Sequence, residues 1–147
     1  MPTAHLVLTS HARDLVTAVD DLRHETAELA AAGLLAANLD DLLGDPGPVV
    51  RWLDDLRSTA EHTANPVLRL PIPSDGTLVQ VAYGLSALLV WSAALHCEGR
   101  LSTAIPAGAL TALGALEHAV GLSGRTARGI DQAAVAIAPA ESMLVIG

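Results

Sequence analysis

The chain has 147 residues, the usual length of one domain, and we predict a single helical domain over residues 1–147. Hydrophobic residues make up 51% of the sequence but aromatic residues only 2%, with no Phe, so the core must consist of Leu, Val and Ala, which favours close-packed helices over sheets. The formal net charge of −8 excludes the basic surface typical of nucleic-acid binding, and a single cysteine excludes an intramolecular disulfide and cysteine-based zinc sites.

The composition and the N-terminal residues also bear on origin and location. All basic residues are arginine, which together with abundant Ala and Gly indicates a GC-rich, bacterial genome. The first residues lack a basic flank followed by an apolar run, so no signal peptide is recognised. We therefore expect the protein to be cytoplasmic.

Apolar residues at alternating steps of three and four predict a first helix over residues 11–37, with Leu15, Val19, Leu22 and Leu29 on its inner face. Either Thr3 or Ser10 could cap its start. A short helical continuation over 38–43 is expected to turn before the next glycine. The sequence Asp-Pro-Gly-Pro at 45–48 then indicates a new start, and a second long helix is predicted over 47–64.

The second half of the chain begins with an extended, proline-rich connection, predicted over residues 66–76. Thr-Leu-Val-Gln at 77–80 resembles a capping box and indicates the start of a helix over 77–97, apolar nearly all round, with Gly99 as its C-terminal cap. Further helices are predicted over 103–120, rich in Gly and Ala, and over 125–138. A short apolar tail, Met143–Ile146, follows.

The helix over 77–97 allows two interpretations. It contains no charged residue between Leu78 and Cys97 and is long enough to cross a bilayer, which would make residues 78–120 a membrane hairpin. Polar residues such as Gln80 and His96 dilute its hydropathy, however, and the amphipathic helices before it need an apolar partner. We therefore favour a central helix wrapped by the others, with Leu85, Leu88, Leu89 and Ala93 buried, over a membrane span.

The tetrapeptide Asp-Asp-Leu-Arg occurs twice, at 20–23 and 54–57, and each copy is followed by a histidine and a glutamate. Asp20, His24 and Glu28, at four-residue spacing, could ligate a metal if another helix completed the ligand shell. These side chains fall on the outer face of the predicted helix, however. We interpret both copies as solvated surface and predict no metal site.

Two weaker groups of residues could bind a ligand. If the helices over 77–97 and 103–120 form an antiparallel hairpin, Gln80 and Tyr83 could meet Glu117 and His118, placing a few polar groups in an apolar pocket. The alternative is that Tyr83 buries its ring while its hydroxyl bonds to one of those two residues or to water, which would make the group structural.

The second group surrounds a predicted helix start. Ser123, Arg125 and Arg128 could hold a phosphate or carboxylate there. The alternative is that both arginines pair with surface carboxylates.

These observations predict an all-α fold, a compact bundle of five or six helices with a central apolar helix at 77–97. No catalytic motif and no cofactor fingerprint is recognised. We favour a non-enzymatic interaction or assembly module that self-associates or binds another protein, and not nucleic acid. The alternatives are a small-molecule binding protein or enzyme with a pocket near Tyr83 and His118, and a small membrane protein.

Overall fold

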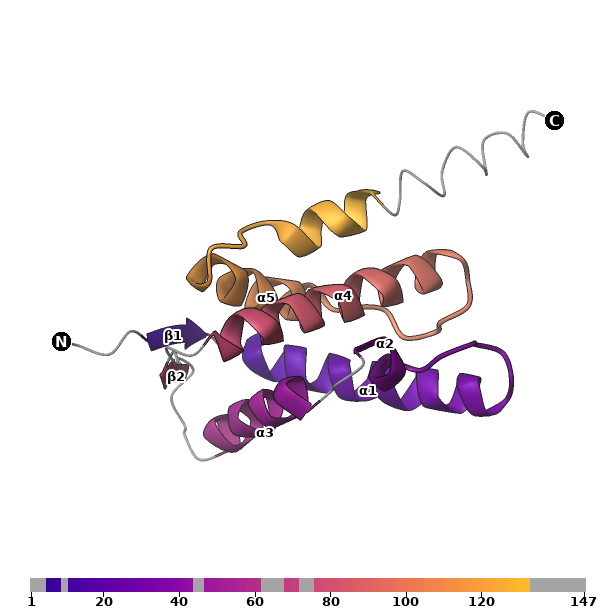
Figure 1. The fold of residues 1–147 in the computed structure, drawn as a ribbon, viewed down its shortest axis with the longest axis horizontal. Helices are drawn as coiled ribbons and strands as arrows, with labels where there is room; N and C mark the ends of the chain where they lie inside the picture. Colours follow the sequence, from indigo (N-terminus) through magenta and orange to yellow (C-terminus); the bar gives the residue numbers. More distant parts are fainter. Residues whose placement is uncertain (1–4, 9–10, 44–46, 62–67, 72–75, 133–147) are drawn as a thin grey trace.

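The structure is a computed structural model that describes residues 5–8, 11–43, 47–61, 68–71 and 76–132. The fold is an all-α bundle with one short β-ribbon (Figure 1). A further helical segment over residues 125–132 follows the last labelled helix. The labelled elements in chain order are β1 (His5–Leu8), α1 (His11–Ala31), α2 (Leu39–Leu43), α3 (Gly47–Glu61), β2 (Leu68–Pro71), α4 (Thr77–Cys97) and α5 (Ala107–Ala119).

The core is formed by leucine and small residues from four helices. Leu15, Val19 and Leu22 of α1 are fully buried, as is Leu56 of α3. On α4, Leu85 and Leu89 are 0% exposed and Leu88 is 1% exposed, as the sequence predicted. Ala93 is only partly buried, so that part of the prediction is wrong. The most extensive helix contact is between α1 and α5, and α4 packs on α3, α5 and α2.

Three described helices end on a glycine in the left-handed region: Gly33 (φ 77), Gly99 (φ 75) and Gly121 (φ 80). After α1, the amide of Leu34 donates to the carbonyl of Leu29 at 2.8 Å. This bond identifies a Schellman motif, which needs a C′ residue of positive φ and therefore favours glycine. Gly99 is confirmed as the cap of α4. The prediction that the first helix continues to residue 37 is wrong, because the chain turns at Gly33.

The cap of α4 and the start of α5 differ from the prediction. The N-cap of α4 is Gly76, without a side-chain capping bond, and Thr77 is the first helical residue, so the predicted capping box is not formed. Helix α5 begins at Ala107 after Pro106, whose backbone is extended, and not at 103. Proline disfavours helix in the residue before it, and Ser102 and Thr103 are bound by a distant carboxylate, described below.

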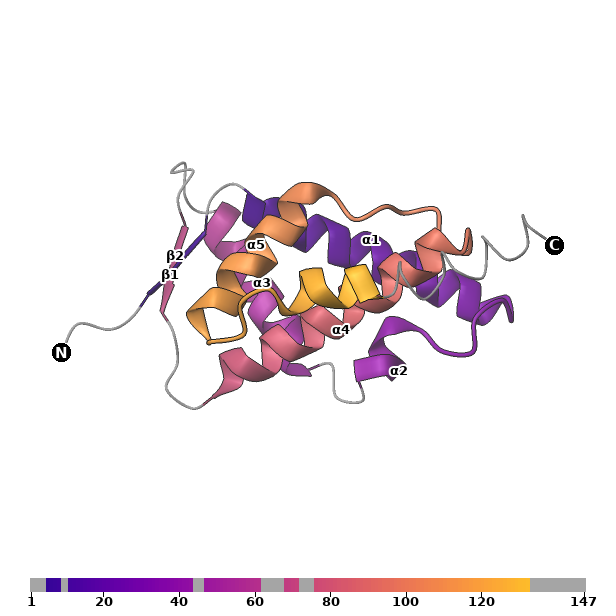
Figure 2. The same ribbon diagram turned by 90° about the horizontal axis from the view of Figure 1, so that it is seen from above.

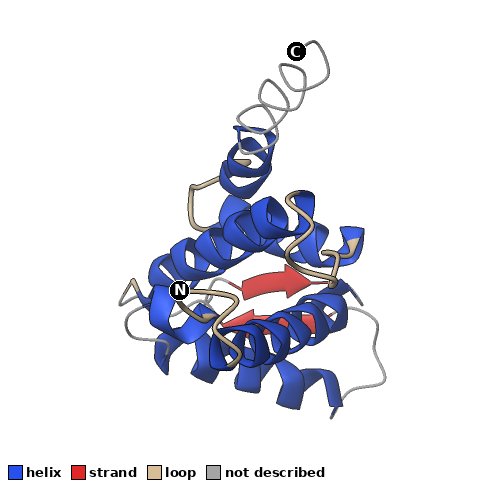
Figure 3. Cartoon of the chain, turned by 90° about the vertical axis from the view of Figure 1, so that its right-hand side faces the viewer, coloured by secondary structure: helices blue, strands red, loops and turns tan. Residues whose placement is uncertain are grey.

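Strands β1 and β2 form a two-stranded antiparallel ribbon, with His5 opposite Pro71 and Leu8 opposite Leu68. The ribbon lies at one end of the bundle, beyond the start of α4 (Figure 2). Seen along the helices, it lies at the far end (Figure 3). The extended connection predicted after residue 66 is thus confirmed at β2. Its pairing with the N-terminal segment was not predicted.

Several expectations concern residues that lie partly or wholly outside the described ranges. The second long helix, predicted over 47–64, is confirmed over 47–61, and residues 62–64 lie outside the described residues. The helix predicted over 125–138 is confirmed over 125–132, and residues 133–138 lie outside the described residues. The apolar tail Met143–Ile146 also lies outside them.

Helix α4 is the one described helix that is long and apolar enough to cross a membrane, with a mean hydropathy of 1.7 over its best 18-residue window. Half of that window is buried inside the bundle. A buried helix of a folded domain has the same length and composition, so these properties alone do not distinguish the two interpretations.

Candidate functional site

One face of α4 is not covered by any other helix in the described part of the chain. Gln80, Tyr83 and Ala87 are exposed along it, and Trp91 and Ala94 are partly exposed. Steps of three and four residues place all five on the same side of the helix. In Figure 1 this face lies between the segment 125–132 on one side and α2 and α3 on the other, while α5 lies behind α4. These five residues are called the α4 stripe below, and none of them is charged.

A hollow of about 420 Å³ borders the α4 stripe on the side of α2 and α3. Gly84 allows this close packing, because a Cβ atom at this position would lie 2.8 Å from Cγ2 of Val49. Most of the wall is apolar, and the side chains of Gln80 and Tyr83 supply its polar groups. The lining residues are Leu43, Pro48, Val49, Gln80, Tyr83, Gly84 and Ala87.

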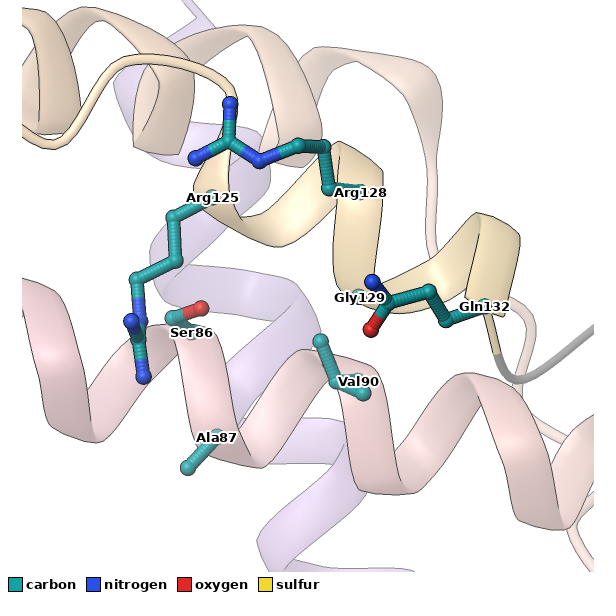
Figure 4. A pocket seen from close by; sticks show the side chains of 7 residues that line it. All are labelled: Ser86, Ala87, Val90, Arg125, Arg128, Gly129 and Gln132. Atoms are coloured by element: carbon teal, nitrogen blue, oxygen red, sulfur yellow. The ribbon is translucent and has the colours of Figure 1, made fainter.

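A second hollow, of about 350 Å³, separates α4 from the segment 125–132 (Figure 4). Its floor includes Ala87 and Val90, so Ala87 borders both hollows. The two helical segments approach closely at Gly129, where a Cβ atom would lie 2.7 Å from Cγ2 of Val90. The α4 stripe is therefore an apolar surface with a depression on each side.

A buried polar cluster holds the segment 125–132 against α4 and α5. Glu117 is 2% exposed and Thr126 is 3% exposed. The backbone amide of Thr126 donates to Oε2 of Glu117 at 3.0 Å, and its hydroxyl lies 2.9 Å from the hydroxyl of Ser86. Buried polar groups need such partners, so this cluster fixes the position of the segment. Through Thr126 it also links the middle of α4 to the end of α5.

The four residues predicted to form a ligand pocket lie in two places. Gln80 and Tyr83 line the hollow beside α2 and α3. Glu117 is buried and bonds to Thr126, while His118 is exposed with Nδ1 3.0 Å from Oγ of Ser123. Ligand binding by these residues stays a prediction, and the geometry places only the first two on a common cavity wall.

The residues predicted to bind an anion are neighbours, but their groups diverge. The guanidinium of Arg125 lies over the ring of Tyr83, 4.5 Å from its centroid. Arg128 turns the other way and donates to the carbonyl of Ser123 at 3.1 Å. Figure 4 shows the two arginine side chains pointing in opposite directions from the segment that carries them. Anion binding therefore also stays a prediction, and it would require Arg128 to move.

Both Asp-Asp-Leu-Arg sequences lie on the surface, with Leu22 and Leu56 turned into the core. The arginines do more than solvate this surface. Arg23 of α1 makes a two-pronged ion pair with Asp40 of α2, at 2.9 and 3.0 Å. Arg57 of α3 pairs with Asp20 of α1, so the second copy binds the first. The two copies thus connect three helices, which the sequence alone did not indicate.

No group of three or more His, Cys, Asp or Glu side chains among the described residues is arranged to hold a metal ion. His24 and Glu28 form a pair at 3.1 Å with both side chains largely exposed, and Asp20 binds Arg57.

We expect the variant Asp20→Ala/His24→Ala/Glu28→Gln to change the free energy of unfolding by no more than about 0.5 kcal/mol for each substitution. Denaturant titration measures this, and elemental analysis of the purified protein should find no stoichiometric zinc or iron. Metal that is bound by the wild type and lost in the variant would contradict this interpretation.

Glu25 is a structural residue that sequence reasoning missed. One of its carboxylate oxygens accepts bonds from the amide and hydroxyl of Ser102, at 2.7 and 3.0 Å. The other accepts from the amide and hydroxyl of Thr103, at 2.9 and 2.6 Å. Partial burial raises the pKa of Glu25, but these four hydrogen bonds outweigh it and lower the pKa to about 2. The carboxylate clamps the loop between α4 and α5 onto α1. In the sequence the only sign of this contact is the adjacent pair Ser102-Thr103, and the pair does not indicate which carboxylate it binds.

Charge is distributed unevenly along the chain. Residues 11–61, which include α1 to α3, contain eleven of the 16 carboxylates and four arginines. Residues 76–132, which include α4 and α5, contain three carboxylates and three arginines. The negative charge therefore belongs to the first three helices, and the half of the fold that carries the α4 stripe is close to neutral.

No protein-family model, curated protein or solved structure matches the chain.

Proposed function

We propose that this chain is a non-enzymatic assembly module that self-associates through the exposed face of α4. The observation that carries the proposal is the α4 stripe, five residues without charge among which Tyr83 is 43% exposed, on a protein with a net charge of −8. Contiguous exposed apolar surface of this kind marks interaction sites, because its contact with water is unfavourable. Aromatic residues are enriched, and charged residues depleted, in the cores of such interfaces.

The distribution of charge supports the same proposal. Two copies that meet through α1 to α3 bring carboxylate-rich surfaces together and repel each other. Two copies that meet through α4 bring together the five residues of the α4 stripe, none of which is charged. Other polar side chains bond to one another inside the fold, as in the cluster of Glu117, Thr126 and Ser86. The proposal thus leaves α4 as the favoured contact.

Size-exclusion chromatography with light scattering, without detergent, tests the proposal. We expect a mass at least twice that of the 15.1 kDa chain at micromolar concentration, falling towards the monomer on dilution. A monomer that persists at high concentration would contradict it. A protein that is found entirely in the membrane fraction would instead favour the membrane alternative for α4.

A second candidate function is binding of a small apolar molecule in the hollow lined by Gln80 and Tyr83. The volume of about 420 Å³ falls within the range of small-molecule sites, and the wall is apolar with two polar side chains. A fluorescent apolar dye such as anilinonaphthalene sulfonate is a direct probe. If the site exists, the monomeric protein should bind one dye per chain, and Ala87→Leu, which places a larger side chain at an exposed position on the wall of the hollow, should weaken binding.

A further inference from the structure

We infer that the two hollows beside α4 form one binding site for a small amphipathic anion, a molecule with an apolar body and a single carboxylate, and that Arg125 binds the carboxylate. The inference rests on the second candidate function, an apolar ligand in the hollow lined by Gln80 and Tyr83, and it specifies the class of that ligand. It follows from the charges that line the hollows, from the contacts of Arg125 and from the way the two hollows adjoin.

The charge of the lining differs from that of the whole chain. The protein has 16 acidic residues and only eight basic ones. The residues that line the two hollows nevertheless include two arginines, Arg125 and Arg128, and no aspartate or glutamate. On neighbouring α2, Asp40 forms an ion pair with α1, and Asp41 accepts a bond from the amide of Asn38. This lining attracts an anion and gives a cation no carboxylate to bind.

Arg125 is the residue that can hold the acidic end of the ligand. Among the described residues it makes no ion pair with a carboxylate. Its guanidinium lies over the ring of Tyr83 and reaches from its own segment to α4, beside Ala87 (Figure 4). A guanidinium above an aromatic ring keeps N–H groups in its own plane for other acceptors, and a carboxylate can accept two of them at once.

The anion contacts the side chain of Arg125 and not the start of the helical segment that carries it. At that start the backbone amide of Thr126 donates to the buried carboxylate of Glu117, so an acidic group of the protein already occupies the position. Arg128 donates to the carbonyl of Ser123 and can remain there. The inferred site therefore differs from the anion site expected from the sequence, because it requires no movement of Arg128.

The apolar body of the ligand fits the hollow of about 420 Å³, whose wall includes Leu43, Pro48 and Val49. Ala87 lines both hollows, so a molecule that lies across this small side chain occupies the two at once. Its chain is then removed from water by apolar side chains, while its carboxylate meets Arg125. A purely apolar molecule would fill the first hollow and leave the guanidinium without an acceptor.

Binding of octanoate and of 1-octanol tests the inference, because the two probes have the same apolar chain and differ in the charge of the head group. Chemical-shift titration of ¹⁵N-labelled protein, dilute and monomeric at pH 7, measures both affinities. We expect octanoate to bind about tenfold more tightly, through its charge-assisted contact with Arg125. The preference should decrease as sodium chloride is added, since exposed charges are screened. The amides of Gly84 and Gly129, one from each hollow, should shift, and Gly108, which lines neither, should not.

Substitution of Arg125 separates the effect of charge from that of the hollow. Arg125→Gln should weaken octanoate binding about tenfold and change octanol binding by less than about twofold, and Arg125→Lys should keep part of the preference. Ala87→Leu should weaken both probes, because Ala87 lines both hollows. The matched control is Arg51→Gln, an exposed position on α3 that lines neither hollow, which should leave both affinities unchanged. Circular dichroism verifies that each variant is folded.

The possible outcomes separate the inference from the candidate function on which it rests. If neither probe binds the monomer, both are overturned. Equal affinity for the two probes, or a preference for octanoate that Arg125→Gln does not reduce, overturns the inference and leaves an apolar ligand in the first hollow. Octanoate that shifts amides outside the two hollows only also overturns it. A protein that remains oligomeric on dilution and binds neither probe supports self-association and overturns the inference.

Discussion

Replacement of Leu89 by alanine is expected to lower the free energy of unfolding by about 2–5 kcal/mol, the range observed for large-to-small substitutions in protein cores. Leu89 is 0% exposed on the inner face of α4, where this helix packs on the rest of the bundle. The substitution removes three carbon atoms from a closely packed site, and neighbouring helices that are held by their own contacts cannot fully close the cavity. Urea titration of the two proteins measures the difference.

The control for this prediction is Leu110→Ala on α5, where the leucine is 36% exposed. The same chemical change at this position should cost well under half as much, because part of the side chain already contacts water. Equal losses at the two positions, or no loss at position 89, would show that the inner face of α4 is not the core of the folded protein. Both variants retain the α4 stripe, so they should not alter self-association directly.

Local signals in the sequence were enough to place the helix that carries the candidate site. The bounds of α4 agree with the prediction because its ends depend on neighbouring residues, namely prolines before it and Gly99 after it. The all-α class followed from the same kind of signal, apolar residues at helical spacing with no phenylalanine to fill larger spaces. Each of these signals depends on residues within one or two helical turns of one another, so it can be read from a single sequence.

The features that were missed depend on contacts between distant residues. Helix α5 begins at Ala107 after Pro106, and the loop before it is held by the carboxylate of Glu25, far away in the sequence, which binds the amides of Ser102 and Thr103. The β-ribbon pairs residues 5–8 with residues 68–71, and neither segment alternates strongly enough to indicate the other. The pairing of Arg57 with Asp20 also joins two separate helices. No local pattern specifies these partners.

The candidate site was only partly predictable for a related reason. A helix that is apolar on all sides has no periodicity to show which side its neighbours cover, so the sequence favoured a fully wrapped helix. Only the positions of α2, α3 and the segment 125–132 reveal that the side with Tyr83 and Ala87 is open. Glu117 was considered as a ligand-binding group, but its burial against Thr126 gives it a structural partner.

The stability of the protein is expected to fall in acid through Glu25. The folded-state pKa of this carboxyl is about 2, against an ordinary value of 4.5. A depressed pKa in the folded state stabilises the fold fully above the unfolded value, and this contribution is lost as the pH falls from about 4.5 to about 2. At about 1.4 kcal/mol per pKa unit, and with allowance for screening at the surface, the contribution at neutral pH is about 1–3 kcal/mol.

The variant Glu25→Gln isolates this contribution. Glutamine keeps one acceptor oxygen, but it presents an NH₂ group to the donors of the second Ser-Thr position, so at pH 7 we expect a loss of about 1–3 kcal/mol in urea titration. Repeated at pH 4, 3 and 2.5, the difference between wild type and variant should shrink steadily, because below about pH 4.5 the carboxyl of the unfolded wild type takes up a proton that the folded carboxyl, with a pKa of about 2, does not. Asp21→Asn, an exposed position on the same helix, should stay within about 0.5 kcal/mol of the wild type at pH 7. A difference between Glu25→Gln and the wild type that does not change with pH would mean that the clamp acts by shape alone, without the charge of the carboxylate.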